Sequence, residues 1–192
     1  MKQILKLGFT LAVFAVVSCF ALALVNHITS PIIAEYKIQK ANAAMKAVFA
    51  DADGFEELTE FPASSDTAIA LEKMYFAKKA GETVGIIVQA TGPTYDKATM
   101  MIGFQKDGVL SGVQFLALSD TPGFGLKAND PSYTVASGKT FVEQFAGKDA
   151  KAGFTIGETF DAVSGATITS KGVSAILNAS AKSALEVLKN VQ

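Results

Sequence analysis

The sequence predicts an α+β protein, with one N-terminal transmembrane helix followed by a single domain that has an antiparallel sheet and flanking helices. Three observations support this fold class. A long apolar segment lies near the N-terminus, four strand patterns occupy the middle of the chain, and an amphipathic helix pattern lies near the C-terminus. We therefore expect a membrane anchor in residues 1–34 and one extracytoplasmic domain in residues 35–192, long enough to bury a hydrophobic core.

The apolar segment Leu7–Val25 has the length of a membrane-spanning helix. At about 1.5 Å per residue, it matches the roughly 30 Å hydrocarbon core of a bilayer. A cleaved signal peptide is the main alternative, but its apolar region usually has only ~7–15 residues. The cleavage-like run Ala21–Ala23 lies inside the apolar segment, and the segment also continues past Cys19, where lipoprotein processing is a second alternative. An uncleaved anchor is the prediction.

The order of the parts predicts the orientation better than the charge does. Lys2 and Lys6 precede the span, but Lys37 and Lys40 follow it, so the positive-inside bias is slight. A short N-terminal tail before a large domain is typical of a signal anchor whose N-terminus stays in the cytoplasm. We expect a single-pass protein of the cytoplasmic (inner) membrane with its C-terminal domain on the extracytoplasmic side.

The composition argues against several classes of function. The chain has 18 acidic and 17 basic residues and no basic run, which gives no electrostatic support for nucleic-acid binding. Its one cysteine, Cys19, lies in the predicted span, so the domain can form neither a disulfide nor a cysteine-ligated iron–sulfur cluster. No Gly-x-Gly-x-x-Gly follows a strand, so no nicotinamide-binding fold is expected. No metal site is predicted either, because the acidic pair Asp51 and Asp53 lacks the other ligands of a calcium loop.

The patterns between the span and the C-terminus predict two helices and four strands. Helices are expected over Tyr36–Phe49, which ends at the turn Asp51–Gly54, and over Thr140–Lys148, which ends near a glycine. Strands are expected over Lys73–Lys79, Thr83–Ala90, Thr99–Gln105 and Val109–Leu118. The turn Lys106–Gly108 between the last two strands predicts a hairpin, which makes the sheet antiparallel.

The run Asp161–Ser170 combines small residues with four hydroxyls directly before a C-terminal helix. The apolar face of that helix is formed by Val173, Ile176, Leu177, Ala181, Ala184 and Leu188. The turn Ser164–Thr167 is therefore expected at a helix N-terminus, where unpaired backbone N–H groups and the macrodipole favour an anion such as phosphate. From the residues alone, plain N-capping is the favoured interpretation of these hydroxyls, because Ser and Thr before a helix usually cap it.

The pattern Asp-x-x-Ser-Gly-Ala-Thr-x-Thr in this run resembles the flavinylation motif of the FMN-binding domain family. That family includes the G subunit of the Rnf electron transport complex and the C subunit of the sodium-translocating NADH:quinone reductase. The resemblance implies covalent FMN, joined by a phosphodiester to the hydroxyl of Thr167, and a separate magnesium-dependent flavin transferase that uses FAD and reads the motif, including Asp161. Since the only histidine is the distant His27, no base is evident for self-catalysed attachment, and Thr167 is predicted to be an anchor rather than a catalyst. The other expected cofactor contacts in this run are Ser164, Gly165, Ala166 and Thr169.

A second loop, Thr121–Gly125, contains a Pro-Gly turn that would expose backbone N–H groups. From the residues alone it could be an ordinary surface turn. With Asp120, the loop resembles the family's Glu-Thr-Pro-Gly-Leu-Gly loop, which lies against the flavin, although Asp120 replaces the usual Glu and Phe124 the usual Leu. The resemblance implies further cofactor contacts at Thr121, Pro122, Gly123, Phe124 and Gly125.

The resemblance implies a covalent-FMN electron-carrier subunit of a membrane-bound Rnf-type ferredoxin:NAD oxidoreductase coupled to sodium or proton translocation. Such a protein would turn over no substrate alone, and its expected partners are the other membrane and peripheral subunits, membrane lipid and the flavin transferase. Two alternatives remain open at this point. One is the FMN-carrying C subunit of a sodium-translocating NADH:quinone reductase, and the other is a non-redox membrane-anchored binding protein in which Thr167 only caps a helix.

Overall fold

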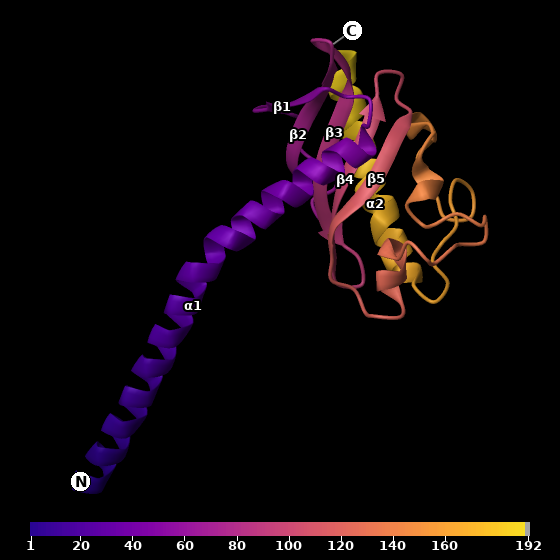
Figure 1. Cartoon of the computed structure of the whole chain (residues 1–192). Coiled ribbons are helices and arrows are strands. Elements are labelled where there is room, and N and C mark those ends of the chain that lie inside the picture. The colour runs from indigo at the N-terminus through magenta and orange to yellow at the C-terminus, as the bar shows by residue number, and fades with distance from the viewer. Residues whose placement is uncertain (191–192) are drawn as a thin grey trace. The chain divides into compact units, whose positions relative to one another are not determined.

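The structure, a computed structural model, describes residues 1–190 and confirms the α+β class. Helix α1 (Lys2–Val48) comes first, five strands follow, and helix α2 (Thr167–Lys189) comes last (Figure 1). The strands are β1 (Gly54–Leu58), β2 (Ala70–Lys79), β3 (Glu82–Pro93), β4 (Lys97–Gln105) and β5 (Leu110–Leu118). Three short 3₁₀ helices, η1 (Gly125–Asn129), η2 (Glu143–Phe145) and η3 (Ala150–Ala152), lie between β5 and α2.

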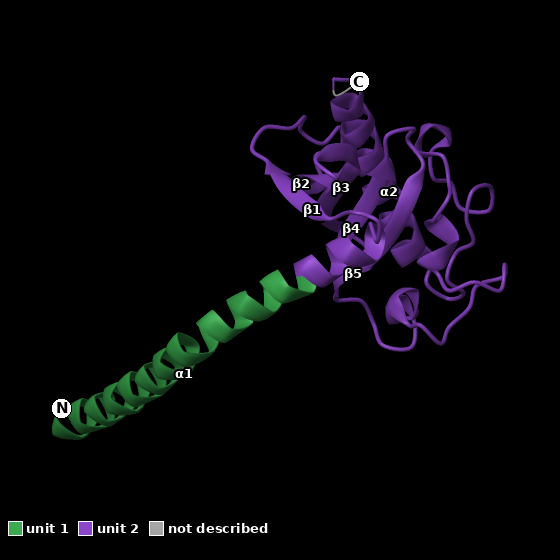
Figure 2. Cartoon of the chain, turned by 45° about the horizontal axis from the view of Figure 1, so that its top comes forward, with its two compact units in different colours: residues 1–40 green, residues 41–192 purple. Residues whose placement is uncertain are grey.

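The contacts divide the chain into two compact units, Met1–Lys40 and Ala41–Gln192 (Figure 2). Helix α1 is long and apolar enough to cross a membrane, and none of its most apolar stretch is buried within the protein. The helix predicted over Tyr36–Phe49 is confirmed as far as Val48. It is not a separate helix, however, because α1 runs without interruption from the apolar segment to Val48. Pro31 lies inside it, where its missing N–H removes one backbone bond without ending the helix.

The five strands form one antiparallel sheet in the order β1-β2-β3-β4-β5. All four predicted strands are confirmed, and each begins and ends within three residues of its expected bounds. The hairpin between β4 and β5 is also confirmed, and Gly108 adopts a φ of 90°, which favours glycine. The remaining strand, β1, was not predicted, because its five residues include Glu56 and Glu57 and show no strict alternation.

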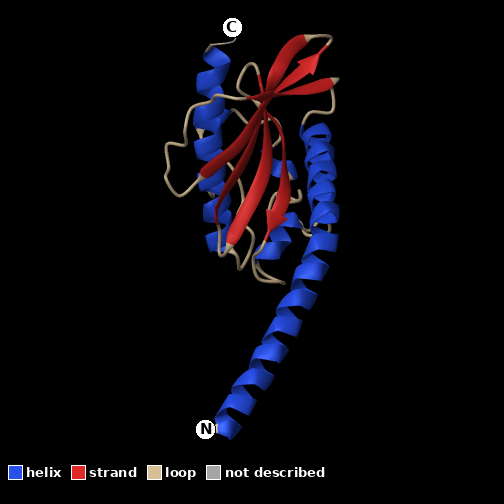
Figure 3. Ribbon diagram, turned by 90° about the vertical axis from the view of Figure 1, so that its left-hand side faces the viewer, coloured by secondary structure: helices blue, strands red, loops and turns tan. Residues whose placement is uncertain are grey.

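Different helices cover the two faces of the sheet (Figure 3). On one face, the C-terminal end of α1 packs through Met45 and Val48, together with Phe49, against Ile87 and Met101. The sheet glycines Gly85, Gly103 and Gly112 leave room for Val48 and Phe49, and a Cβ atom at Gly85 would lie 2.4 Å from the Phe49 ring.

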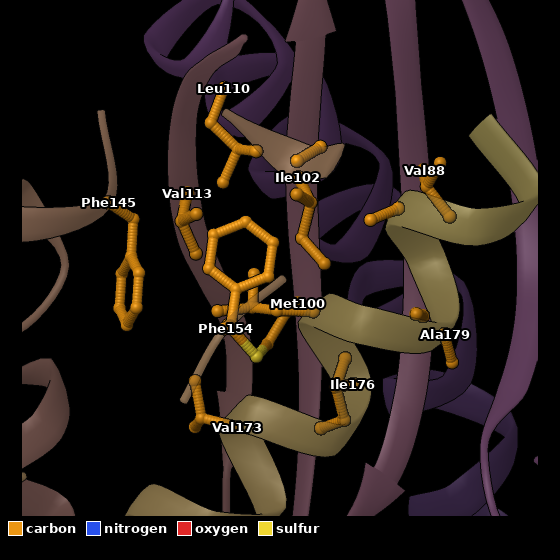
Figure 4. Close-up of a cluster of buried hydrophobic side chains, with 14 of the residues drawn as sticks. Val88, Met100, Ile102, Leu110, Val113, Phe145, Phe154, Val173, Ile176 and Ala179 are labelled. Atoms are coloured by element: carbon orange, nitrogen blue, oxygen red, sulfur yellow. The ribbon is translucent and has the colours of Figure 1, made fainter. Parts of the chain in front are cut away.

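Helix α2 covers the other face and buries the predicted apolar stripe. Its side chains meet those of β3, β4 and β5 in the main core (Figure 4). All six residues predicted for the apolar face of the helix are buried, among them Val173, Ile176 and Leu177 at 0% exposure. Burying one such aliphatic side chain contributes about 1.5–3 kcal/mol, so packing against the sheet holds α2 in place.

The helix predicted over Thr140–Lys148 was wrong, because only η2 forms there. Phe141 and Phe145 are both buried and meet edge to face at 5.4 Å. The backbone pairs with a strand instead of with itself, since Leu110 exchanges hydrogen bonds with Gly147 and Lys148. The four-residue spacing of the two phenylalanines is compatible with a helix, but also with a single turn that packs both rings on the core.

Candidate functional site

Helix α2 begins at Thr167, and no side chain caps it. The residue before the helix is Ala166, and the Thr167 side chain is exposed. The buried hydroxyls of the run bond elsewhere: Thr169 donates to Asp120, and Ser170 accepts from the Val163 N–H and donates to the Ala166 carbonyl. The interpretation of Thr167 as a plain helix cap is therefore wrong.

The start of α2 also presents unpaired backbone donors. The first helical bond runs from the Ser170 N–H to the Ala166 carbonyl, at 3.0 Å. Within residues 1–190, no protein group accepts a hydrogen bond from the N–H of Thr167, Ile168 or Thr169. These three donors and the macrodipole favour an anion at this position.

The loop Thr121–Gly125 lies against the start of α2. The Phe124 ring packs beside the Gly165 backbone, because a Cβ atom at Gly165 would lie 3.6 Å from Phe124 Cδ1. Gly123 and Gly165 both have a φ of 77°, which glycine adopts without strain. The two loops, far apart in the sequence, therefore form neighbouring walls.

The turn between β3 and β4 supplies a third wall. Gly172 of α2 lies directly on this turn, since a Cβ atom there would be 2.3 Å from the Pro93 carbonyl oxygen and 2.7 Å from Thr94 Cα. The next residue in the turn, Tyr95, is 66% exposed. Sequence reasoning missed Tyr95, because a single exposed tyrosine in a turn carries no motif.

The three walls line an open cavity of about 470 Å³. It is lined by Tyr95, Thr121, Phe124, Gly125, Gly165, Ala166, Thr167, Ile168 and Thr169. Phe124 and Ile168 are 57% and 58% exposed, so with Tyr95 they offer apolar surface to a ligand. The volume lies within the range of small-molecule sites.

Seven of the ten residues predicted as cofactor contacts line this cavity, and three do not. Ser164, Pro122 and Gly123 lie outside the lining, although all three are exposed and adjoin residues within it. The Ser164 N–H donates to the Tyr133 hydroxyl at 3.2 Å. Tyr95 and Ile168 line the cavity although neither was predicted.

Asp161 lies away from this cavity and lines a separate one of about 250 Å³. Its carboxylate accepts a hydrogen bond from the Ser137 N–H at 2.9 Å. The Gln144 side chain accepts from the Asp161 N–H and donates to the Asp161 carbonyl. Asp161 therefore ties the first residue of the motif to Ser137 and Gln144.

The chemistry of the main cavity suits FMN, which has an anionic phosphate end and a flat apolar ring. The open N-terminus of α2 matches the phosphate, and the exposed Tyr95, Phe124 and Ile168 match the ring. The Thr167 hydroxyl receives no hydrogen-bond partner from the described residues. Within residues 1–190, no cluster of three or more histidine, cysteine or acidic side chains could hold a metal ion.

Comparison with known proteins gives two family matches. Residues 95–182 match the FMN-binding domain, and residues 1–48 match the RnfG N-terminal region. The first of these ranges begins at Tyr95 and includes every residue that lines the cavity.

Similar proteins extend the match to nearly the whole chain. The G subunit of the Na(+)-translocating ferredoxin:NAD(+) oxidoreductase complex of Acetobacterium woodii is 34% identical over 93% of this chain and 90% of its own length. The G subunit of the proton-translocating complex of Clostridium ljungdahlii is 28% identical, with 85% and 82% covered. The G subunit of an ion-translocating oxidoreductase complex of Pseudomonas aeruginosa is also 28% identical, with 90% and 84% covered. The chain therefore belongs to the RnfG family, the G subunits of ion-translocating oxidoreductase (Rnf) complexes.

Proposed function

We propose that this chain is the covalent-FMN electron-carrier subunit of a membrane-bound, ion-translocating ferredoxin:NAD oxidoreductase complex. One observation carries the proposal: an exposed threonine hydroxyl without a partner lies between an open helix N-terminus and an apolar cavity. The names of the relatives support the reaction, and they differ in the ion, which is sodium in one and protons in another. The proposal therefore covers either ion.

Thr167 is the proposed attachment point of FMN. A flavin transferase would remove the proton from the Thr167 hydroxyl, an oxygen–phosphorus bond would form, and the pyrophosphate bond of FAD would break to release AMP. The N–H groups of Thr167, Ile168 and Thr169 are placed to bind the phosphate oxygens. An external enzyme is needed because no base contacts this hydroxyl among the described residues.

The walls of the cavity are proposed to hold the isoalloxazine ring. Phe124, Tyr95 and Ile168 would cover its apolar surface, and the exposed backbone at residues 121–124 would reach its polar edge. When bound, the flavin supplies the ability to accept and release electrons, while the protein positions the ring and tunes its electronic properties. Pro122 and Gly123 would contribute by shaping the loop and Ser164 by shaping the motif turn, rather than by lining the cavity.

The proposed setting is a single-pass anchor in the cytoplasmic membrane with residues 35–192 on the extracytoplasmic side. The apolar helix α1, the one candidate span within residues 1–190, and the ion-translocating complexes of the relatives support the membrane anchor. The short N-terminal tail before a large domain is the argument for the side. The proposed partners are the other subunits of the complex, the flavin transferase and membrane lipid.

Substitution at Thr167 tests the proposal directly. The full chain, produced in a host that contains a flavin transferase, should carry one FMN on the peptide that includes Thr167. Thr167→Ala should abolish in-gel flavin fluorescence, whereas Thr167→Ser should keep it because the hydroxyl remains. Thr67→Ala, which changes an exposed threonine between β1 and β2 that does not line the cavity, is the control and should keep the label. FMN found only on Thr169 or Ser170, or a fluorescent Thr167→Ala protein, would contradict the assignment.

A further inference from the structure

Asp120 is a buried acid that the proposed attachment chemistry does not use. It precedes the loop Thr121–Gly125 and is only 4% exposed. Its Oδ1 accepts hydrogen bonds from the Thr94 hydroxyl at 2.6 Å and from the Asp96 N–H at 2.9 Å. Its Oδ2 accepts from the Thr169 hydroxyl at 2.5 Å. One carboxylate thus joins three segments of the chain that are distant in sequence.

These three segments are the three walls of the cavity. Thr94 and Asp96 flank Tyr95, Asp120 adjoins the loop that carries Phe124, and Thr169 follows Thr167 in the first turn of α2. The contact between Asp120 and Thr169 is tightly packed, because a Cβ atom at Gly125 would lie 2.5 Å from Asp120 Cβ and 2.6 Å from Thr169 Oγ1. Gly125 and Thr169 line the cavity themselves, so the carboxylate lies directly behind its wall.

We propose that Asp120 is the positioning residue of the FMN site, and that its carboxylate holds Tyr95, Phe124 and Thr167 in one rigid frame and sets the potential of the ring. This inference rests on the proposed function. The phosphate linkage fixes only one end of FMN, so the ring's position depends on the walls. Thr169, predicted as a cofactor contact, acts in this frame through its hydrogen bond to Asp120.

The charge of Asp120 determines in which direction the carboxylate shifts the midpoint potential of the flavin. Burial opposes ionisation, but hydrogen bonds from Thr169, Thr94 and the backbone of the Tyr95–Asp96 turn outweigh it and lower the pKa of the carboxyl below its usual value. The group is therefore anionic at neutral pH. A negative charge behind the cavity wall disfavours the extra electron density of reduced FMN, so it lowers the midpoint potential.

Two kinds of variant separate the charge from the frame. Asp120→Asn removes the charge but keeps an oxygen that can accept from Thr94 and Asp96. It should retain covalent FMN with wild-type fluorescence anisotropy and shift the midpoint potential upward. Thr169→Val keeps the charge and breaks the link to α2, so the ring should become more mobile and its anisotropy should fall. Asp120→Ala should both raise the midpoint potential and lower the flavin anisotropy.

Asp96→Asn is the matched control, because it removes a carboxylate charge from an exposed side chain in the β3–β4 turn, whose backbone N–H bonds to Asp120. Its effect on the potential should be smaller, since solvent screens an exposed charge. The measurements are a spectroelectrochemical titration, flavin anisotropy and thermal unfolding of the full chain in detergent. If Asp120→Ala does not fold, the other two variants still decide.

Two results would overturn the proposal, and they are distinguishable. If wild-type protein carries FMN but Asp120→Asn and Thr169→Val leave its potential and anisotropy unchanged, Asp120 has no positioning role. If wild-type protein made with a flavin transferase carries no FMN, the proposed function fails, and the role of Asp120 toward FMN fails with it.

Discussion

At the scale of single residues, the buried Asp120 carboxylate should make folding sensitive to acid. Its pKa is lowered in the folded state, so its stabilising contribution is complete above its unfolded pKa of about 3.9 and is lost as pH falls below that value. The difference in free energy of unfolding between wild type and Asp120→Asn should therefore shrink when pH falls from about 6 to about 3. Hydrogen bonds from Ser132 and Thr140 also lower the pKa values of Asp130 and Glu143. Wild type and Asp120→Asn both contain these two acids, so their contributions cancel in the difference. Chemical denaturation at the two pH values measures the difference, and a constant difference would contradict the prediction.

At the scale of elements, the contact between α2 and the β3–β4 turn holds the cavity walls together. Gly172→Ala would place a Cβ atom 2.3 Å from the Pro93 carbonyl oxygen, and backbone atoms cannot move aside as a side chain can. Overpacking of this kind costs about 1–3 kcal/mol and should exceed the gain in helix propensity, about 1 kcal/mol. We expect a net loss of stability in thermal or chemical unfolding. Gly54→Ala is the control, since nothing lies within 4 Å of its Cβ position. A Gly172→Ala protein as stable as wild type would show that the contact is loose.

At the scale of the whole molecule, the proposed topology predicts the behaviour of fusion proteins. The apolar part of α1 is exposed throughout the structure, which is unfavourable in water and expected in a bilayer. A reporter that is active only in the cytoplasm should be silent when fused after Gln192 and active when fused before Met1. Resistance of the full chain to alkaline carbonate extraction would accompany this pattern. A strong cytoplasmic signal from the C-terminal fusion would reverse the orientation, and a mature protein that begins at lipidated Cys19 would exclude the retained span.

Local patterns predicted most of the fold because the forces behind them act over a few residues. The apolar stripe from Val173 to Leu188 has the period of a helix, and the segments that became β2 to β5 have strand composition and a hairpin turn. Strand β1 escaped prediction because it depends on pairing with β2, where Gly54 lies opposite Lys78. The helix expected over Thr140–Lys148 failed for a similar reason, since hydrogen bonds to Leu110 replace helical ones.

The sequence by itself determined the family resemblance, the membrane segment and the two loops of the site, because each consists of residues that are consecutive in the chain. Only the tertiary structure decided that these loops share one cavity and that Tyr95 and Ile168 complete it. It also decided the place of Asp161, which lines a separate cavity and accepts a hydrogen bond from the Ser137 N–H. The link between Asp120 and Thr169 joins residues 49 positions apart. No local pattern specifies such a contact, because it forms only when the packing of α2 on the sheet brings the two segments together.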